Sequence, residues 1–127
     1  MKFLCIGYYN AEKMDAKPKG VIETVMSECG PHLDTFYKTG QVLLDVGVEQ
    51  GEKQVRRNSG QVKVTASQED GEKIGSVFIL EAGNMEEAIQ VASLHPSVQV
   101  EAGEEFDWRL EVHRVHTYKG DRNLKTT

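Results

Sequence analysis

The sequence predicts an α+β fold in which one antiparallel sheet has helices on one face. The expected elements run strand, helix, strand, hairpin, strand, helix, strand, which is the split βαβ pattern of a ferredoxin-like sandwich. The strands around Phe3, Val42 and Val77 are apolar on both alternating faces, so each face of the sheet needs a cover. Helices cover one face. Because most soluble oligomers are symmetric, we expect a second copy of the chain to cover the other face and form a homodimer.

The first half of the chain alternates strand and helix signals. Residues 3–9 form an apolar run and predict a strand, and the polar residues 10–19 predict a loop. Apolar residues at helical spacing follow from Val21 to Cys29. Gly30-Pro31 predicts a break, with a second helical piece over 31–38 that ends before Gly40.

The second half predicts three strands, a hairpin and one helix. Strands are expected over 42–48, 76–81 and 108–112, with a hairpin that turns at 58–60 and a further turn over 68–72. Asn84 followed by Glu86 and Glu87 predicts the start of a helix, and His95-Pro96 predicts its end. A short acidic loop precedes the last strand. We expect one domain over 1–118 and a polar tail over 119–127.

Composition excludes several classes of function. The chain has 127 residues, with 20 acidic and 15 basic side chains and a net charge of -5, which argues against binding to nucleic acid. It contains no apolar run of membrane-spanning length and no signal-peptide pattern, so we expect no membrane partner. Cys5 and Cys29 lack metal-ligand spacing, and we expect two buried thiols in a reducing cytoplasm, with neither a metal nor a cofactor.

Several segments together resemble the YCII-related family, which also includes proteins named for a DGPF motif. The resemblance spans about residues 1–116. The matching segments are Met-Lys-Phe-Leu-Cys-Ile-Gly-Tyr at 1–8, Pro-His-Leu at 31–33, Thr-Gly-Gln-Val-Leu at 39–43, Gly-Ser-Val-Phe-Ile-Leu-Glu at 75–81, Asn-Met-Glu-Glu-Ala at 84–88, His-Pro at 95–96 and Glu-Val at 111–112.

The resemblance implies a ferredoxin-like fold that dimerises through its sheet into an α+β barrel. Proteins of this shape include cofactor-free oxygenases and isomerases. The family carries a histidine near the first helix, which is His32 here, and an aspartate in an Asp-Pro pair after the second helix. That aspartate is replaced by His95 before Pro96, and Val-Thr-Ala-Ser at 64–67 stands where the DGPF motif would fall.

Three residues are candidates for acid or base chemistry. His32 follows Gly30-Pro31 at an expected helix start, where the helix dipole would favour a neutral imidazole able to act as a base. The alternative is a partly exposed histidine with one hydrogen bond. His95 could orient it, or could simply end its helix. Asp45 lies in an apolar strand, so it either pairs with one of these histidines or faces solvent at a sheet edge.

Four further residues are candidates for lining a pocket. Tyr8 and Tyr9 end the first strand, and one of them is expected to point into a cavity. The other two, Arg109 and His113, share one strand face with Glu111, where a solvated ladder of charge pairs is favoured over a polar cleft.

Two functions remain open. In the first, the chain is a small-molecule enzyme in which His32 acts as acid or base and His95 or Asp45 orients it. In the second, it is a non-catalytic dimeric module that binds a metabolite or a protein. The two differ in whether any ligand that binds is also turned over.

Overall fold

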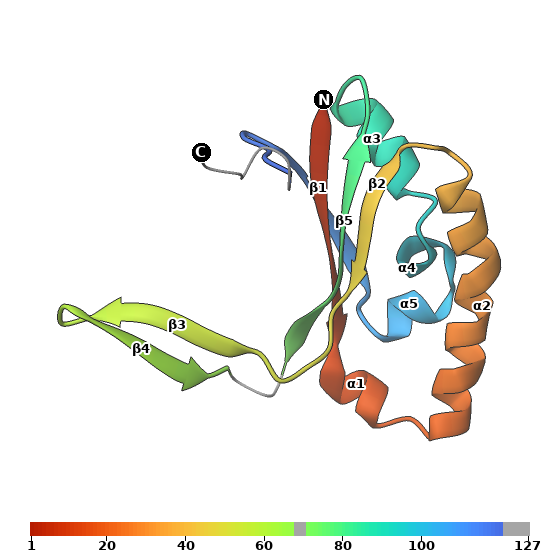
Figure 1. Cartoon of the computed structure of the whole chain (residues 1–127). Helices are drawn as coiled ribbons and strands as arrows, with labels where there is room; N and C mark the ends of the chain where they lie inside the picture. The colour runs from red at the N-terminus through yellow and green to blue at the C-terminus, as the bar shows by residue number, and fades with distance from the viewer. Residues whose placement is uncertain (68–70, 121–127) are drawn as a thin grey trace.

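The computed structural model describes residues 1–67 and 71–120 and has an α+β architecture (Figure 1). Residues 68–70, part of an expected turn, and 121–127, most of the expected tail, lie outside the described residues. The strands are β1 Lys2–Asn10, β2 Val42–Gly47, β3 Lys53–Asn58, β4 Gln61–Ala66, β5 Glu72–Glu81 and β6 Arg109–Arg114. The helices are α1 Ala11–Asp15, α2 Lys19–Tyr37, α3 Met85–Ala92, α4 Pro96–Gln99 and α5 Ala102–Glu105.

Four strands form one antiparallel sheet in the order β2-β5-β1-β6, with the helices on one side (Figure 1). This order places β1 and β5 at the centre of the sheet, as in the split βαβ pattern. The ferredoxin-like α+β prediction is therefore confirmed. The β3-β4 hairpin is inserted between β2 and β5 and forms a separate two-stranded sheet.

The main core lies between the sheet and the helices. Phe3 and Cys5 of β1 pair in register with Leu80 and Phe78 of β5, and all four side chains are fully buried with Phe36 of α2. Because strand side chains alternate, the neighbouring residues point to the opposite face. The residues between these core positions therefore lie on the face of the sheet that the helices do not cover.

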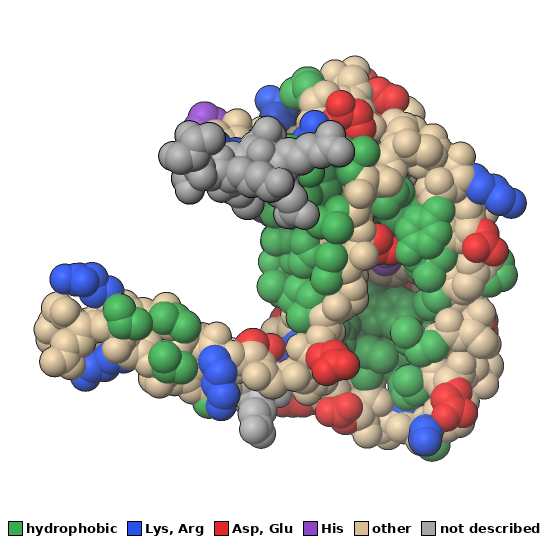
Figure 2. All heavy atoms as spheres, in the orientation of Figure 1, with side chains coloured by type: hydrophobic (Ala, Val, Ile, Leu, Met, Phe, Trp, Pro, Cys, Tyr) green, Lys and Arg blue, Asp and Glu red, His purple; other side chains and the backbone are tan. Residues whose placement is uncertain are grey.

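The opposite face of the sheet is apolar across β1, β2 and β5, charged along β6 through Arg109, Glu111 and His113, and not covered by any helix of the described residues. Its cross-strand pairs are Leu4 with Ile79, Ile6 with Val77 and, from β2, Leu44 with Ile79 and Val46 with Val77. Figure 2 shows hydrophobic side chains gathered on this side of the strands. We call this surface the open face; it carries Leu4, Ile6, Leu44, Val46, Val77 and Ile79.

The hairpin turn lies where the sequence predicts it. Ser59 and Gly60 connect β3 to β4 with φ angles of 53° and 76°, and two successive positive φ angles are typical of a type I′ turn. The hairpin, which we call the arm (residues 53–66), runs away from the sheet on the side opposite the helices (Figure 1).

The predicted break at Gly30-Pro31 is wrong, because α2 is continuous from Lys19 to Tyr37 with Pro31 inside it. An interior proline costs about 3 kcal/mol. Val25, Cys29 and Phe36 lie on the same buried side of the helix, before and after the proline. Burial of each such side chain contributes about 2 kcal/mol, so packing outweighs the lost hydrogen bond.

Three short helices lie in segments expected to be loops. Asn10 caps α1 by accepting a 3.0 Å hydrogen bond from the backbone N–H of Lys13, within the expected loop 10–19. The helices α4 and α5 lie in the expected acidic loop before β6. Each of the three helices has only four or five residues, which is too short to show the periodic apolar pattern of a helix.

Both cysteines are free and buried, as predicted. Burial raises the pKa of the Cys5 thiol to about 12 and also raises that of Cys29. Within the described residues, no helix is long and apolar enough to cross a membrane.

Candidate functional site

A cavity of about 530 Å³ lies between α2 and the helix-covered side of the sheet. In Figure 2, hydrophobic side chains gather in the hollow between α2 and the strands. The polar atoms come from four places in the chain: the ends of β1 and β2, the middle of β5 and the start of α4. The lining residues used below are Tyr8, Tyr9, Met14, Met26, Leu33, Asp45, Gln50, Ser76, His95, Ser97 and Trp108.

His95 is a buried polar residue at the inner end of this cavity. Only 8% of its surface is exposed. Its ring stacks on Phe78 at a centroid distance of 4.9 Å and meets the edge of Phe36 at 5.2 Å. Because the ring is held between two aromatic side chains, it has one well-defined orientation in the cavity wall.

The hydrogen bonds of His95 determine its tautomer. The residue caps α4, and its Nδ1 atom accepts a 3.1 Å bond from the backbone N–H of Ser97. The Ser97 hydroxyl is also 2.7 Å from Nδ1. An atom that accepts from a backbone N–H cannot carry a proton, so the neutral ring carries its proton on Nε2.

Burial keeps the imidazole neutral. It lowers the pKa of His95 to about 4, against an opposing effect of the Asp45 charge, which raises it. At neutral pH the side chain is thus a hydrogen-bond donor through Nε2 and has little capacity to take up a proton.

Asp45 lies in the edge strand β2 and also lines the cavity. Its Oδ2 atom accepts a hydrogen bond from the Tyr37 hydroxyl at the end of α2. That bond is the main reason why the pKa of Tyr37 rises to about 12. The sequence left two alternatives for Asp45, and the structure combines them: the carboxylate is exposed at a sheet edge and also electrostatically coupled to His95.

Both tyrosines at the end of β1 line the cavity. The Tyr9 hydroxyl accepts a 2.8 Å hydrogen bond from the Gln50 amide. Tyr8 donates to Glu111 at 3.0 Å and has the Arg109 guanidinium 4.1 Å from its ring centre. Tyr8 also lines a second hollow, described below.

His32 is not among the residues that line the cavity. It lies in the middle of α2, half-buried, and directly follows Pro31. Because a helix dipole acts only within the first turn, the dipole expected to keep His32 neutral is not available there. The structure therefore brings His95 and Asp45 to one cavity and places His32 outside its lining.

Arg109 and His113 belong to a ladder of charge pairs on β6. Arg109 binds Glu72 through two 2.7 Å hydrogen bonds and Glu111 through one of 3.0 Å, and Glu111 is 3.2 Å from His113. This arrangement is the solvated ladder favoured by the sequence. These pairs lower the pKa of both Glu72 and Glu111.

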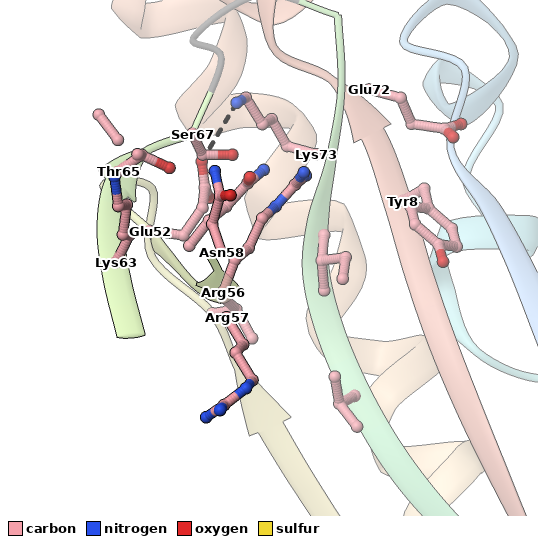
Figure 3. A pocket seen from close by; sticks show the side chains of 15 residues that line it. Tyr8, Glu52, Arg56, Arg57, Asn58, Lys63, Thr65, Ser67, Glu72 and Lys73 are labelled. Carbon is pink, nitrogen blue, oxygen red and sulfur yellow. Dashed lines mark hydrogen bonds and ion pairs between the residues drawn. The ribbon is translucent and has the colours of Figure 1, made fainter. Parts of the chain in front are cut away.

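A second hollow of about 1200 Å³ lies between the arm and the sheet (Figure 3). Arg56, Arg57 and Lys63 line it from the arm, and Tyr8, Ile74 and Val77 line it from the sheet. Lys73 projects from β5 toward the base of the arm, where it donates to Glu52 at 3.1 Å. The hollow is wide and its lining is strongly cationic on one side.

Three residues of the site were not anticipated from the sequence. Tyr37 donates a hydrogen bond to Asp45, and Ser97 donates one to His95. Trp108 lines the cavity wall. Only Ser97 had a local signal, since a proline directly after His95 favours a new helix whose first turn would include Ser97. No group of three or more metal-ligating side chains occurs among the described residues.

Comparison with known proteins places the chain in a family and shows its fold. A solved structure of the 5-chloro-2-hydroxyhydroquinone dehydrochlorinase TftG from Burkholderia phenoliruptrix AC1100, in complex with 2,5-dihydroxybenzoquinone, superposes with a TM-score of 0.52 at 15% identity. The match covers 97% of this chain and 99% of that chain. No curated protein matches significantly. The sequence matches the YCII-related domain over residues 1–109, and the chain therefore belongs to the YCII-related family.

Proposed function

We propose that the chain is a small-molecule enzyme that transfers protons in the cavity between α2 and the sheet. The observation that carries the proposal is the pairing of a neutral, buried His95 with the Asp45 carboxylate in one cavity. A titratable group with a perturbed pKa in a concave, mostly apolar site is the usual mark of an active site.

The geometry supports different roles for the two residues. His95 is a poor base at neutral pH because its pKa is about 4, but its Nε2–H can donate to an oxygen that gains negative charge. Asp45 is the acceptor in the same cavity and is suited to take a proton from the substrate. Tyr37 holds the carboxylate through its hydroxyl.

The cavity favours a small, planar, oxygenated substrate. Its walls include Met14, Leu33 and Trp108, while its few polar atoms lie near His95 and Asp45. A volume of about 530 Å³ suits a compact ring and some solvent. The dehydrochlorinase with a similar fold is named for acting on a chlorinated hydroquinone. Loss of hydrogen chloride needs a base for the proton and stabilisation of the charge left on oxygen, which Asp45 and His95 could supply.

The test is turnover of hydroquinones, chlorinated hydroquinones and hydroxyquinones by the purified protein, followed by absorbance and chloride release. His95→Asn removes the Nε2 donor, while an asparagine can still cap α4. Asp45→Asn removes the base. We expect each variant to lower kcat about 100-fold or more for any compound that turns over, because positioned proton transfer contributes that much.

A different result would favour the binding module. If these compounds bind in the cavity by NMR and none is turned over, the catalytic proposal fails and a metabolite-binding role remains. If turnover occurs but His95→Asn and Asp45→Asn retain it, the assignment of the two residues is wrong.

The catalytic role expected for His32 stays a prediction. We expect His32→Gln to affect kcat less than His95→Asn, because His32 does not line the cavity. A loss as large as that of His95→Asn would instead support His32 as the acid or base.

We also infer that the chain assembles as a homodimer through the open face. Leu44 and Val46 are 48% and 40% exposed on this face, and Leu4, Ile6, Val77 and Ile79 are only partly covered. Contiguous apolar surface of this kind marks an association site. A reducing cytoplasm would suit the two free thiols.

A further inference from the structure

The arm has little support from its own chain. Its two strands pair with each other and form a sheet of their own. Val55, Val62 and Val64 are 67%, 68% and 63% exposed. A two-stranded hairpin alone is marginally stable in water, so an extended arm with three exposed valines needs a surface to pack on.

The arm also has the opposite charge to the rest of the chain. Residues 53–66 contain four of the 15 Lys and Arg residues and none of the 20 Asp and Glu residues, so the remaining residues hold eleven cations against twenty carboxylates. The arm is thus basic and the body is acidic. A second copy of this same chain is a partner of complementary charge.

Two arm cations are directly opposite each other, and no counter-ion for either occurs among the described residues. Arg56 and Lys63 are directly opposite across the hairpin, an arrangement of like charges that destabilises an isolated pair of strands. In the part of the chain that the structure describes, neither side chain forms an ion pair. Carboxylates from another molecule would relieve this repulsion.

The base of the arm is tied to the sheet in a defined direction. Lys73 of β5 is 8% exposed and binds Glu52, the residue immediately before β3 (Figure 3). The backbone N–H of Ser67, just after β4, donates to the carbonyl of Glu52 at 3.5 Å. The Ser67 bond joins the two ends of the arm to each other, and the Lys73–Glu52 ion pair links the direction of the arm to the sheet within one chain.

That direction brings the arm beside whatever covers the open face. The arm extends on the side of the sheet opposite the helices (Figure 1), and Figure 2 shows a concavity bounded by the arm and by the apolar strands. Six extended residues span about 20 Å, whereas two packed sheets lie about 10 Å apart. The arm is therefore long enough to pass the sheet of a docked second copy.

The arm also supplies interface area that the sheet lacks. Four strands of about six residues cover about 400 Å² in projection, and the two arm strands add about 200 Å². The arm therefore enlarges the projected contact area by about half.

We propose that the arm of each copy packs on the partner copy in a homodimer. Val55, Val62 and Val64 lie on the face of the hairpin turned away from the hollow and become buried against the partner. Arg56 and Lys63 lie on the face that lines the hollow and approach carboxylates of the partner there. By two-fold symmetry the contact is made twice. The proposal rests on the homodimer inferred above and names the element that holds it together; it is independent of the chemistry in the cavity.

The test is dimer affinity by sedimentation equilibrium for matched pairs of valine variants. Val62→Ser/Val64→Ser removes apolar contacts from the arm. The control, Val21→Ser/Val98→Ser, changes two valines that are 44% and 48% exposed on the helix side of the molecule. We expect the arm pair to raise the dimer Kd about 100-fold and the control pair to leave it within about threefold. Arg56→Glu/Lys63→Glu is expected to weaken the dimer as well.

A second measurement locates the contact directly and does not depend on how the variants fold. In a mixture of isotope-labelled and unlabelled wild-type chains, methyl groups of Val55, Val62 and Val64 should show NOEs to the other copy. A dimer whose affinity is unchanged in the arm variants, and whose arm methyls show no intermolecular NOE, overturns the arm proposal and leaves the sheet dimer standing. A wild-type protein that is monomeric at all concentrations overturns both, without bearing on turnover in the cavity.

Discussion

The surroundings of one imidazole in the cavity determine its hydrogen-bonding state. His95 is held between Phe36 and Phe78, and its Nδ1 atom is occupied by Ser97. These contacts leave Nε2–H as the atom free to reach a ligand and make the protonated ring costly. A histidine in this state is a hydrogen-bond donor at neutral pH, which is why Asp45 is the better candidate for the base.

The depressed pKa of His95 predicts that stability falls with acid over a defined range. The unfolded chain takes up a proton on this imidazole near pH 6.5, whereas the folded chain does so only near pH 4. Stability from this residue is complete above about pH 6.5 and is lost as the pH falls toward 4. We expect the wild type to lose about 3 kcal/mol more of its unfolding free energy than His95→Asn between pH 7 and pH 4.

Denaturant unfolding of both proteins at several pH values measures this difference. The carboxylates whose pKa values are lowered, such as Glu72 and Glu111, are present in both proteins, so their effect cancels in the comparison. Parallel stability curves for the two proteins would show that His95 takes up a proton normally in the folded state.

At the scale of single elements, local hydrogen bonds and tertiary packing contribute in different ways to the helices. Asn84 starts α3 by accepting a 2.8 Å bond from the N–H of Glu87, and the Glu87 carboxylate accepts a 2.6 Å bond from the N–H of Gly83. This start is encoded within five residues, and the sequence predicted its cap at Asn84. The unbroken course of α2 through Pro31 depends instead on burial of Phe36 against the distant Phe78.

The cap at Asn84 gives a prediction at this scale. Asn84→Ala should lower the unfolding free energy by about 1 kcal/mol, because the N–H of Glu87 loses its side-chain acceptor. Asn84→Asp should retain most of the stability, since aspartate caps equally well. Denaturant unfolding measures both, and equal losses in the two variants would exclude capping as the cause.

At the scale of the whole molecule, the sheet separates two surfaces of different character. One face supports the core and the cavity, and the other is the apolar open face beside the arm (Figures 1 and 2). Adjacent residues of β1 belong to different surfaces: Cys5 is fully buried in the core, and Ile6 points to the open face.

This alternation predicts opposite effects for the same substitution at neighbouring positions. Ile6→Asp should leave the chain folded and weaken the proposed dimer, because a carboxylate on the open face is solvated only in the monomer. Cys5→Asp should lower the unfolding free energy by several kcal/mol, because it buries an unpaired charge. Sedimentation and thermal unfolding separate these outcomes, and a fully dimeric Ile6→Asp protein would contradict association through this face.

By itself, the sequence determined the strands, the Ser59-Gly60 turn, the capped start of α3 and the membership of an α+β class. These features depend on period-two apolar patterns, positive φ angles and side-chain caps, all of which act over a few residues. The resemblance in its motifs also identified the family.

Only the tertiary structure decided the composition of the site. It placed His95 and Asp45 in the lining of one cavity, left His32 outside that lining, and supplied Tyr37, Ser97 and Trp108. His95 and Asp45 are fifty positions apart, and they meet because β2 pairs with β5 while α4 packs behind β5 through the stack of His95 on Phe78. Such long-range packing leaves no periodic mark in the sequence, because it depends on how whole faces fit together.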